Sequence, residues 1–308
     1  MTLKGRYAQS HTVVKLIQWI GCVVVLSMLA AVGMVFFELP FSVSSLKWIQ
    51  LIQSAAMFLL PPLCMAYLWS EQPLEWLKIR REARGERLEV RGERVWAVGL
   101  MLAALPAINL LAYLNQQMSL PAFLEPLEQW MKTQEANAAV LTEQFLNVRS
   151  IGGLIINVLL LALLPAVAEE LTFRGVLQGL LGERREAKGE RVPHVAIWCS
   201  AILFSAIHMQ FYGFVPRMLM GALFGYMLVW TGSLWVPILM HFTNNVMAVL
   251  VYYFVQRAGW DMEQMNAMGT NDTLWLGVAS MVITIVGIYA FRRSTTMSRA
   301  SSRMSSGS

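Results

Sequence analysis

The sequence predicts an all-α, polytopic membrane protein with about eight transmembrane helices. Of its 308 residues, 56% are hydrophobic and only 14% are charged, a balance that does not suit a soluble globular protein. The polar residues are concentrated in short segments between apolar stretches of roughly twenty residues, the length that a helix needs to cross the hydrocarbon core of a bilayer. We therefore expect a single transmembrane helical domain over residues 1–293.

Apolar length defines each span in chain order. The predicted spans are residues 12–37, 47–69, 94–115, 148–180, 194–211, 214–231, 234–256 and 274–291. The first is longer than the apolar core of a signal peptide and is not followed by a small-residue cleavage pattern. We expect it to remain in the protein as a membrane anchor.

Charge in the connections predicts the orientation. Basic residues gather near 4–15, 78–94, 184–191 and 292–303, which are alternate connections, whereas the connection near 116–147 is acidic. Because basic residues concentrate on the cytoplasmic side of short loops, we expect both termini to face the cytoplasm, with the protein in a bacterial inner membrane. This arrangement accounts for the net charge of +5 better than nucleic-acid binding, and we expect no nucleic-acid partner.

The acidic connection also contains apolar side chains at helical intervals. They lie between residues 120 and 131 and predict an amphipathic helix near 120–146 on the outer membrane interface. Such a helix is either a lid or a passive interfacial element, and the sequence leaves both open.

The end of the chain has a different composition. Residues 294–308 are rich in serine, with scattered arginine and no core-forming side chains. A segment of this kind cannot bury enough apolar surface to fold by itself. We therefore expect a disordered cytoplasmic tail.

Charged and polar side chains inside the spans are the candidates for function. An ionised group within a span costs on the order of 2.5 to 3.5 kcal/mol on insertion scales unless it is paired or hydrated, so such residues are functional by default. The fourth span contains Glu169, Glu170 and Arg174, the fifth contains His208, and the seventh contains His241. The other two histidines lie outside the spans.

Helical spacing separates the two glutamates. Glu170 and Arg174 are four residues apart and share a face, so we expect Arg174 to neutralise Glu170 and to fix the helix. Glu169 points about 100° away from Glu170 and is free to face a cavity.

The histidines have helical partners as well. His241 and Asn245 are four residues apart and share a face, so both can point at one centre. Phe204 precedes His208 by the same interval and is expected to pack beside it. Together with the glutamates, these side chains suit catalysis in the half of the chain that contains all of them.

A carboxylate and two imidazoles around a buried water allow two related chemistries. In the first, His208 and His241 with an oxygen of Glu169 or Asn245 hold Zn²⁺, which activates the water and polarises the scissile carbonyl. In the second, Glu169 with His208 activates the water as a general base, while His241 and Asn245 stabilise the tetrahedral oxyanion. The residues alone leave zinc as an open alternative.

At these positions the sequence resembles the CPBP family, the CAAX proteases and bacteriocin-processing enzymes that are also called ABI. The motifs that match are Glu169-Glu170-x-x-x-Arg174, Phe204-x-x-x-His208 and His241-x-x-x-Asn245. They occur in the family's order and on separate predicted helices. The resemblance covers residues 150–250, while the first three spans and the last are similar only in character.

The resemblance implies an eight-helix glutamate protease or metalloprotease that cleaves a membrane-tethered peptide or protein substrate within the bilayer. It also implies that Glu169 activates water, that His208 assists, and that His241 and Asn245 form the oxyanion site. The remaining motif residues would support these four. Neither a metal requirement nor the natural substrate follows from the resemblance.

Two other classes of function are compatible with the sequence. One is a non-catalytic immunity or scaffold membrane protein that uses the same fold to bind a peptide or a membrane partner. The other is a proton-coupled transporter, which also explains buried carboxylates and histidines. The two halves of the chain show no repeat of the spans, and this argues against the transporter.

Overall fold

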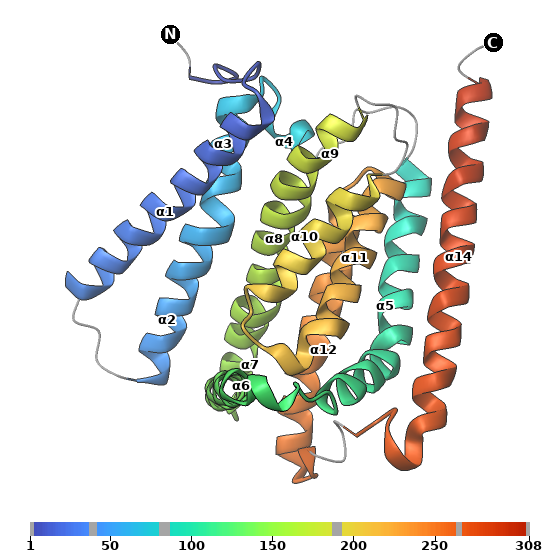
Figure 1. The fold of residues 1–308 in the computed structure, drawn as a ribbon. Helices are drawn as coiled ribbons and strands as arrows, with labels where there is room; N and C mark the ends of the chain where they lie inside the picture. The colour runs from blue at the N-terminus through green and yellow to red at the C-terminus, as the bar shows by residue number, and fades with distance from the viewer. Residues whose placement is uncertain (1–2, 37–41, 80–86, 187–192, 263–266, 306–308) are drawn as a thin grey trace.

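The structure is a computed structural model that describes residues 3–36, 42–79, 87–186, 193–262 and 267–305. Within these ranges every regular element is a helix, which confirms the predicted all-α class. Figure 1 shows the helices side by side in a bundle, with α6 across one end.

Most of the elements are α-helices, interrupted by π-helical segments (η1, η3 and η4) and short 3₁₀ turns (η2, η5 and η6). In chain order they are α1 (Thr12–Phe36), α2 (Val43–Ser54), η1 (Ala55–Leu59), α3 (Leu60–Trp69), α4 (Pro73–Trp76), α5 (Arg87–Gln116), η2 (Ala122–Leu124), α6 (Glu125–Leu146), α7 (Ile151–Asn157), η3 (Val158–Leu163), α8 (Leu164–Glu170), η4 (Leu171–Gln178), α9 (Gly179–Glu186), α10 (His194–Ala206), η5 (Phe211–Gly213), α11 (Phe214–Thr231), α12 (Trp235–Ala258), η6 (Asn271–Thr273) and α14 (Leu274–Ser305).

Among the described residues, seven helical segments are long and apolar enough to cross a membrane. They correspond to seven of the eight predicted spans. The fifth span, predicted at 194–211, differs because α10 has only 13 residues, or about 20 Å at 1.5 Å per residue, against a hydrocarbon core of about 30 Å. α10 ends at Ala206, and Met209 in the following turn has a left-handed φ of 53°. His208 therefore lies in a turn beyond the helix.

The fourth predicted span, 148–180, is a continuous helical rod from Ile151 onward, and its winding changes along its length. α7, η3, α8, η4 and α9 follow one another without a break (Figure 1). Pro165 follows η3, and Pro61 follows η1. A proline cannot donate to the preceding turn, and its ring clashes with the carbonyl four residues earlier, so we attribute the wider π-helical turns before these prolines to that clash. Glu169 and Glu170 lie at the end of α8, where η4 begins.

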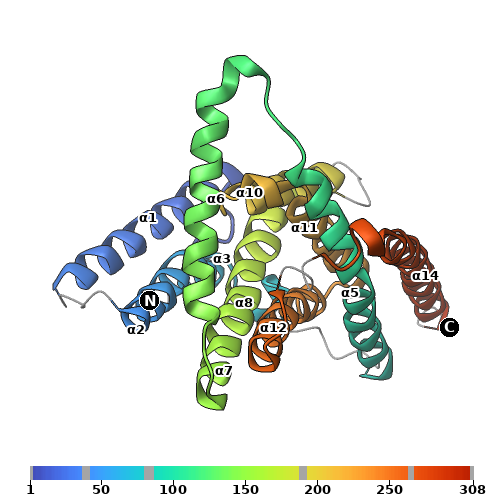
Figure 2. The ribbon, with the colours of Figure 1, turned by 90° about the horizontal axis from the view of Figure 1, so that it is seen from below.

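α6 lies across one end of the bundle. Figure 1 shows α6 end-on, and Figure 2 shows its full length. Glu128 stabilises the start of this helix, because its Oε2 accepts a 2.9 Å hydrogen bond from the Leu120 N–H and its Oε1 pairs with Lys132 at 2.8 Å. The hydrogen bond from Lys132, followed by that from Leu120, holds the pKa of Glu128 below its ordinary value. A helix is present within the segment 120–146, as predicted, and its position on the outer membrane interface stays a prediction.

The first and last helices show how the two ends of the chain are placed. The start of α1 and the end of α14 lie at the same end of the bundle (Figure 1). The prediction that both termini face the cytoplasm stays a prediction. The basic connections at 80–86 and 187–192 lie outside the described residues.

α14 is longer than its apolar segment. In the structure the helix continues through Ser305, whereas disorder was expected from residue 294; residues 306–308 lie outside the described residues. The segment 294–305 contains neither glycine nor proline, and extending an existing helix is far easier than starting one. Ser294 and Thr295 also donate side-chain hydrogen bonds to the Phe291 carbonyl, which is compatible with a helix.

Two buried apolar clusters hold the central helices together. One is built around Trp69 and Leu180 and includes Leu228 of α11. The other contains Phe224 of α11 and Phe291 of α14, with residues of α5. Both clusters include residues of α11 and α12, so packing fixes these two helices against the fourth span on one side and against α5 and α14 on the other.

Candidate active site

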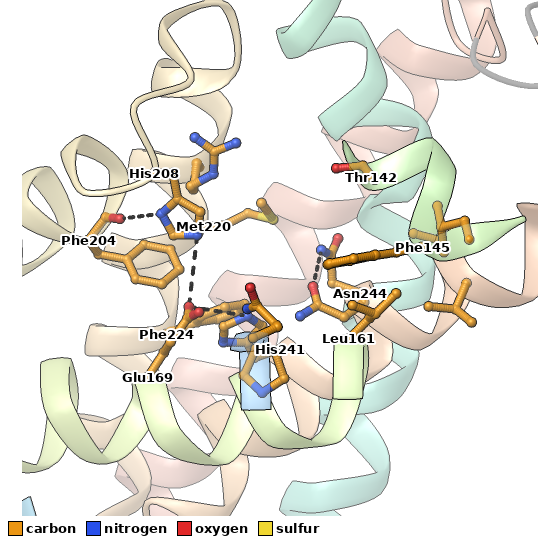
Figure 3. Close-up of a pocket in the computed structure, with 17 residues that line it drawn as sticks. Thr142, Phe145, Leu161, Glu169, Phe204, His208, Met220, Phe224, His241 and Asn244 are labelled. Atoms are coloured by element: carbon orange, nitrogen blue, oxygen red, sulfur yellow. Dashed lines mark hydrogen bonds and ion pairs between the residues drawn. The ribbon is translucent and has the colours of Figure 1, made fainter. Parts of the chain in front are cut away.

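Five of the residues singled out by the sequence line one cavity of about 440 Å³, whereas Glu170 and Arg174 do not: the five are Glu169, Phe204, His208, His241 and Asn245. Glu169 comes from the end of α8, His208 from the turn after α10, and His241 and Asn245 from α12. Figure 3 shows Glu169, His208 and His241 facing one another in the cavity wall. Side chains that are costly in a membrane and distant in sequence are therefore brought together.

The carboxylate of Glu169 lies between the two imidazoles. Its Oε2 is 3.9 Å from Nε2 of His208 and 3.9 Å from Nε2 of His241. This oxygen is buried and forms no hydrogen bond with any residue that the structure describes. Direct hydrogen bonds are about 2.7–3.2 Å long, so the three atoms are spaced to share a water rather than to bond to each other.

Each imidazole is oriented by a hydrogen bond at its other nitrogen. Nδ1 of His208 donates to the Phe204 carbonyl at 2.8 Å, and Nδ1 of His241 lies 2.9 Å from Oε1 of Glu170. A carbonyl and an ion-paired carboxylate only accept, so both Nδ1 atoms have the proton. In its neutral form, each ring then presents an unprotonated Nε2 to Glu169, where it can accept a proton.

Glu170 and Arg174 form the predicted ion pair. Nη1 of Arg174 lies 2.6 Å from Oε1 of Glu170, and both side chains are fully buried. Nη2 of Arg174 donates to the Gly221 carbonyl at 3.0 Å. Because the same Glu170 oxygen accepts from His241, the pair also orients an imidazole of the cavity. Helical spacing predicted the pair but not its contact with α12.

The glycines of α11 explain how this pair is accommodated. A Cβ at Gly221 would lie 3.1 Å from Nη2 of Arg174, and one at Gly225 would lie 2.6 Å from Oε1 of Gln178. Gln178 donates to the Gly225 carbonyl at 3.1 Å, one turn beyond the Arg174 contact. The missing side chains let α11 approach η4 so closely that its backbone carbonyls satisfy two buried polar groups. The Gly-x-x-x-Gly pair therefore packs helices.

Aromatic rings surround the histidines. The rings of Phe204 and His208 have centroids 5.2 Å apart, as their spacing predicted. Phe204 also meets His241 edge-on at 5.8 Å, and Phe224 stacks on His241 at 5.6 Å. The guanidinium of Arg174 lies 4.4 Å from the Phe204 ring centroid and 5.4 Å from that of Phe224. The rings limit the orientations available to both the imidazoles and the guanidinium.

Asn245 lines the cavity one turn after His241. Its Oδ1 accepts a 3.1 Å hydrogen bond from Nδ2 of Asn244, which also lines the cavity (Figure 3). With its oxygen engaged, the Asn245 amide has its N–H groups available as donors. Sequence spacing had predicted that Asn245 and His241 face the same centre, and both do line this cavity.

Several lining residues were not identified from the sequence. Gln50 comes from α2, and Thr142 and Phe145 come from α6, so the amphipathic helix forms part of the cavity wall. Arg217 of α11 also lines the cavity. Its signal was a cation near the start of the sixth predicted span, and the rule that identified Glu169 applies to it equally.

Glu169, His208 and His241 are also the predicted zinc ligands. Two ligand atoms of a tetrahedral zinc ion with bonds near 2.0–2.1 Å are about 3.4 Å apart. Here the separations from Glu169 are 3.9 Å, and across the described ranges no group of three His, Cys, Asp or Glu side chains is arranged to hold a metal ion. The residues as placed do not fit zinc, so the chemistry below is derived from the side chains alone.

The helical bundle and this cavity define a class: polytopic membrane proteins with a Glu, two His and an Asn gathered inside the bundle. Residues 151–247 match the family model described as type II CAAX prenyl endopeptidase Rce1-like, which confirms the resemblance to the CPBP family. The matched segment contains every motif residue and covers less than half of the chain. The rest of the bundle lies outside the match.

A curated relative gives a second comparison. Uncharacterized protein YpbD of Bacillus subtilis (strain 168) is 33% identical over 90 residues, which are 28% of this chain and 40% of that protein. The match thus spans less than half the length of either protein. No solved structure matches the chain.

Proposed function

We propose that this integral membrane protein is an intramembrane endopeptidase that hydrolyses a peptide bond by an activated water. The observation that carries the proposal is the position of the Glu169 carboxylate, 3.9 Å from the Nε2 atoms of both His208 and His241. The similarity of residues 151–247 to a family of membrane endopeptidases supports it. The substrate class is a membrane-tethered peptide or protein that enters the cavity from the bilayer.

In the proposed first step, Glu169 removes a proton from a water held between its Oε2 and the imidazoles. The hydroxide attacks the scissile carbonyl carbon, and the carbonyl oxygen becomes an oxyanion. Nε2 of His208 accepts a hydrogen bond from the same water and directs its lone pair at the carbonyl. General-base catalysis of this kind contributes about 10²–10⁴ in rate.

His241 and Asn245 are the proposed oxyanion donors. The N–H groups of Asn245 can donate directly, whereas Nε2 of His241 donates only in the imidazolium form, because Nδ1–H is already engaged with Glu170. That second proton comes from solvent water before the substrate binds, and the ring keeps it through the cycle. In the second step the proton held by Glu169 passes to the leaving nitrogen, and the C–N bond breaks. One water is consumed, and Glu169 returns to its carboxylate form.

The supporting residues hold this arrangement in place. Arg174 neutralises Glu170, and Glu170 fixes the His241 ring. Phe204 performs two functions, because its carbonyl orients His208 and its ring packs against both imidazoles. We further propose a bacterial inner membrane location with both termini in the cytoplasm, on the basis of the charge distribution.

Loss of substrate cleavage in a Glu169→Ala variant tests the proposal. Membrane proteomes of cells that make the native protein or the variant are compared by mass spectrometry. We expect truncated membrane proteins that appear only with the native protein, while the variant accumulates to the same level in the membrane. Equal truncation with both proteins would refute the proposed role of Glu169.

Glu143→Ala is the matched control. Glu143 is an exposed glutamate of α6 that does not line the cavity. Its replacement should leave the pattern of truncated proteins unchanged. A non-catalytic scaffold protein, by contrast, would produce no truncated proteins with any of the three forms.

A further inference from the structure

We propose that Arg217 binds a carboxylate of the substrate and so selects peptides that have an anionic group close to the scissile bond. The inference rests on the proposed function, since it concerns the same cavity. Two sources of the carboxylate are compatible with the geometry: the free carboxyl terminus of a peptide, or an Asp or Glu side chain.

The first observation is the charge of the cavity wall. Among the described residues that line it, Arg217 is the one cation and Glu169 is the one acid. Arg217 is partly buried on the first turn of α11 and is close enough to His208 and Glu169 for its charge to act on theirs. A group bound by Arg217 therefore lies beside the catalytic residues.

The second observation is how the guanidinium is held. Its Nη2 donates to Oε1 of Gln210 at 2.6 Å, and its Nη1 donates to the Gln210 carbonyl at 3.3 Å. Gly213 makes room for it, because a Cβ there would lie 3.1 Å from Nη2. The side chain is thus held by neutral groups, which do not offset its positive charge. The guanidinium has five N–H donors in all.

The third observation is the contrast with the other buried arginine. Arg174 has its own carboxylate, Glu170, at 2.6 Å. In the part of the chain that the structure describes, no carboxylate oxygen lies within 4.0 Å of Arg217, and the charges of Glu135 and Glu169 act on it only from farther away. A cation in a membrane protein is expensive unless it is paired or hydrated, and arginine pairs best with a planar carboxylate. A substrate carboxylate supplies that partner.

A purely structural role for Arg217, as an anchor of the turn that includes Gln210, makes a different prediction. In that case the variant alters the position of the neighbouring His208 and slows cleavage of all peptides alike. The carboxylate-binding role instead predicts selectivity between peptides that differ only in an anionic group. The experiment is designed on this difference.

The probes are short N-palmitoylated peptides of mixed sequence in three matched sets. The first set ends in a free carboxylate and contains no Asp or Glu, the second ends in a carboxamide and contains no Asp or Glu, and the third ends in a carboxamide and contains one Asp or Glu. Each set is passed over immobilised full-length Glu169→Gln protein in detergent, and the retained peptides are measured by mass spectrometry. Cleavage of the same sets by the native protein is measured in parallel.

Of the first and third sets, which contain a carboxylate, we expect at least one to be retained about tenfold more strongly than the second set, which contains none. This is the preference expected for a partly desolvated charge pair. The set that is enriched identifies the source of the carboxylate. In the same background, Arg217→Gln should abolish the preference and Arg217→Lys should keep part of it. Arg257→Gln is the control, since Arg257 does not line this cavity, and it should keep the full preference.

Equal retention of all three sets, or a preference that survives Arg217→Gln, would overturn the inference. The comparison of peptide sets on Glu169→Gln protein decides the question even if Arg217 variants do not fold. Cleavage without carboxylate preference refutes the role of Arg217 and leaves the proposed protease activity intact. Carboxylate-selective retention without cleavage by the native protein would support the role of Arg217 and refute the proposed protease activity.

Discussion

Replacing Glu170 by glutamine should lower the stability of the protein, whereas replacing Glu169 by glutamine should lower its activity. Glu170 is completely buried and has two partners, Arg174 at 2.6 Å and His241 at 2.9 Å. Glu170→Gln removes its charge and leaves the Arg174 guanidinium unpaired in the bundle. Glu169 lies 3.9 Å from His208 and His241 and has no hydrogen-bond partner among the described residues, so Glu169→Gln removes a charge without breaking a hydrogen bond.

The magnitudes follow from these contacts. Breaking a buried ion pair from one side costs about 3–5 kcal/mol, and we take about 3 kcal/mol because the amide oxygen can still accept a hydrogen bond. At roughly 2–4 °C per kcal/mol, the unfolding temperature of Glu170→Gln should fall by about 6–12 °C. Glu169→Gln should change stability by no more than about 0.5 kcal/mol, while cleavage falls by about 10²–10⁴.

Both quantities can be measured on the same detergent-purified samples. Thermal unfolding is followed by intrinsic tryptophan fluorescence, and cleavage is followed on a substrate identified by the membrane-proteome comparison. The double variant Glu170→Gln/Arg174→Gln serves as the control, because it removes both charges and should be more stable than Glu170→Gln alone. A large loss of stability in Glu169→Gln with none in Glu170→Gln would refute the assignment of the two glutamates.

Two further predictions concern packing and metal. Gly225→Ala places a methyl group where it would meet Oε1 of Gln178 at 2.6 Å, so it should destabilise the protein by about 1–3 kcal/mol. Gly99→Ala is the control and should not destabilise the protein, because no atom lies within 4 Å of the added methyl group. Thermal unfolding of the two variants measures the difference. Treatment with a chelator should leave cleavage within about twofold of the untreated protein, because water activation by a carboxylate needs no metal. The second prediction would be wrong if metal analysis detected zinc in the purified protein and added zinc restored activity lost on chelation.

The fold was largely predictable because apolar length alone determines whether a helix can span a bilayer. The end of α10 was not predictable in this way. The chain turns at Met209, which has a left-handed φ of 53° although methionine is not a turn-forming residue, and no glycine, proline or asparagine lies between Ala206 and Met209. The turn depends on packing against the rest of the bundle, which the local sequence does not reveal.

The site was predictable wherever local helical geometry was sufficient. The pairing of Glu170 with Arg174 needed only a four-residue interval on one helix. The hydrogen bond from His241 to Glu170 joins residues 71 positions apart and depends on how α12 packs against α8. Arg217 was missed although its charge was visible, because a cation near the end of a span is commonly explained by its long side chain reaching the interface.

The pattern of hydrogen bonding separates support from chemistry more sharply than burial does. Glu170, Arg174 and Gln178 are all buried, and each forms at least one hydrogen bond inside the protein. Arg174 and Gln178 donate to the backbone carbonyls of glycines in α11. The Glu169 carboxylate has none with the described residues, and Arg217 bonds only to the neutral Gln210 among them. Both of these charged groups line the same cavity. An acid and a cation without a hydrogen-bonded counter-charge are unfavourable for folding. We therefore explain their joint presence there by a substrate that supplies a scissile carbonyl to one and a carboxylate to the other.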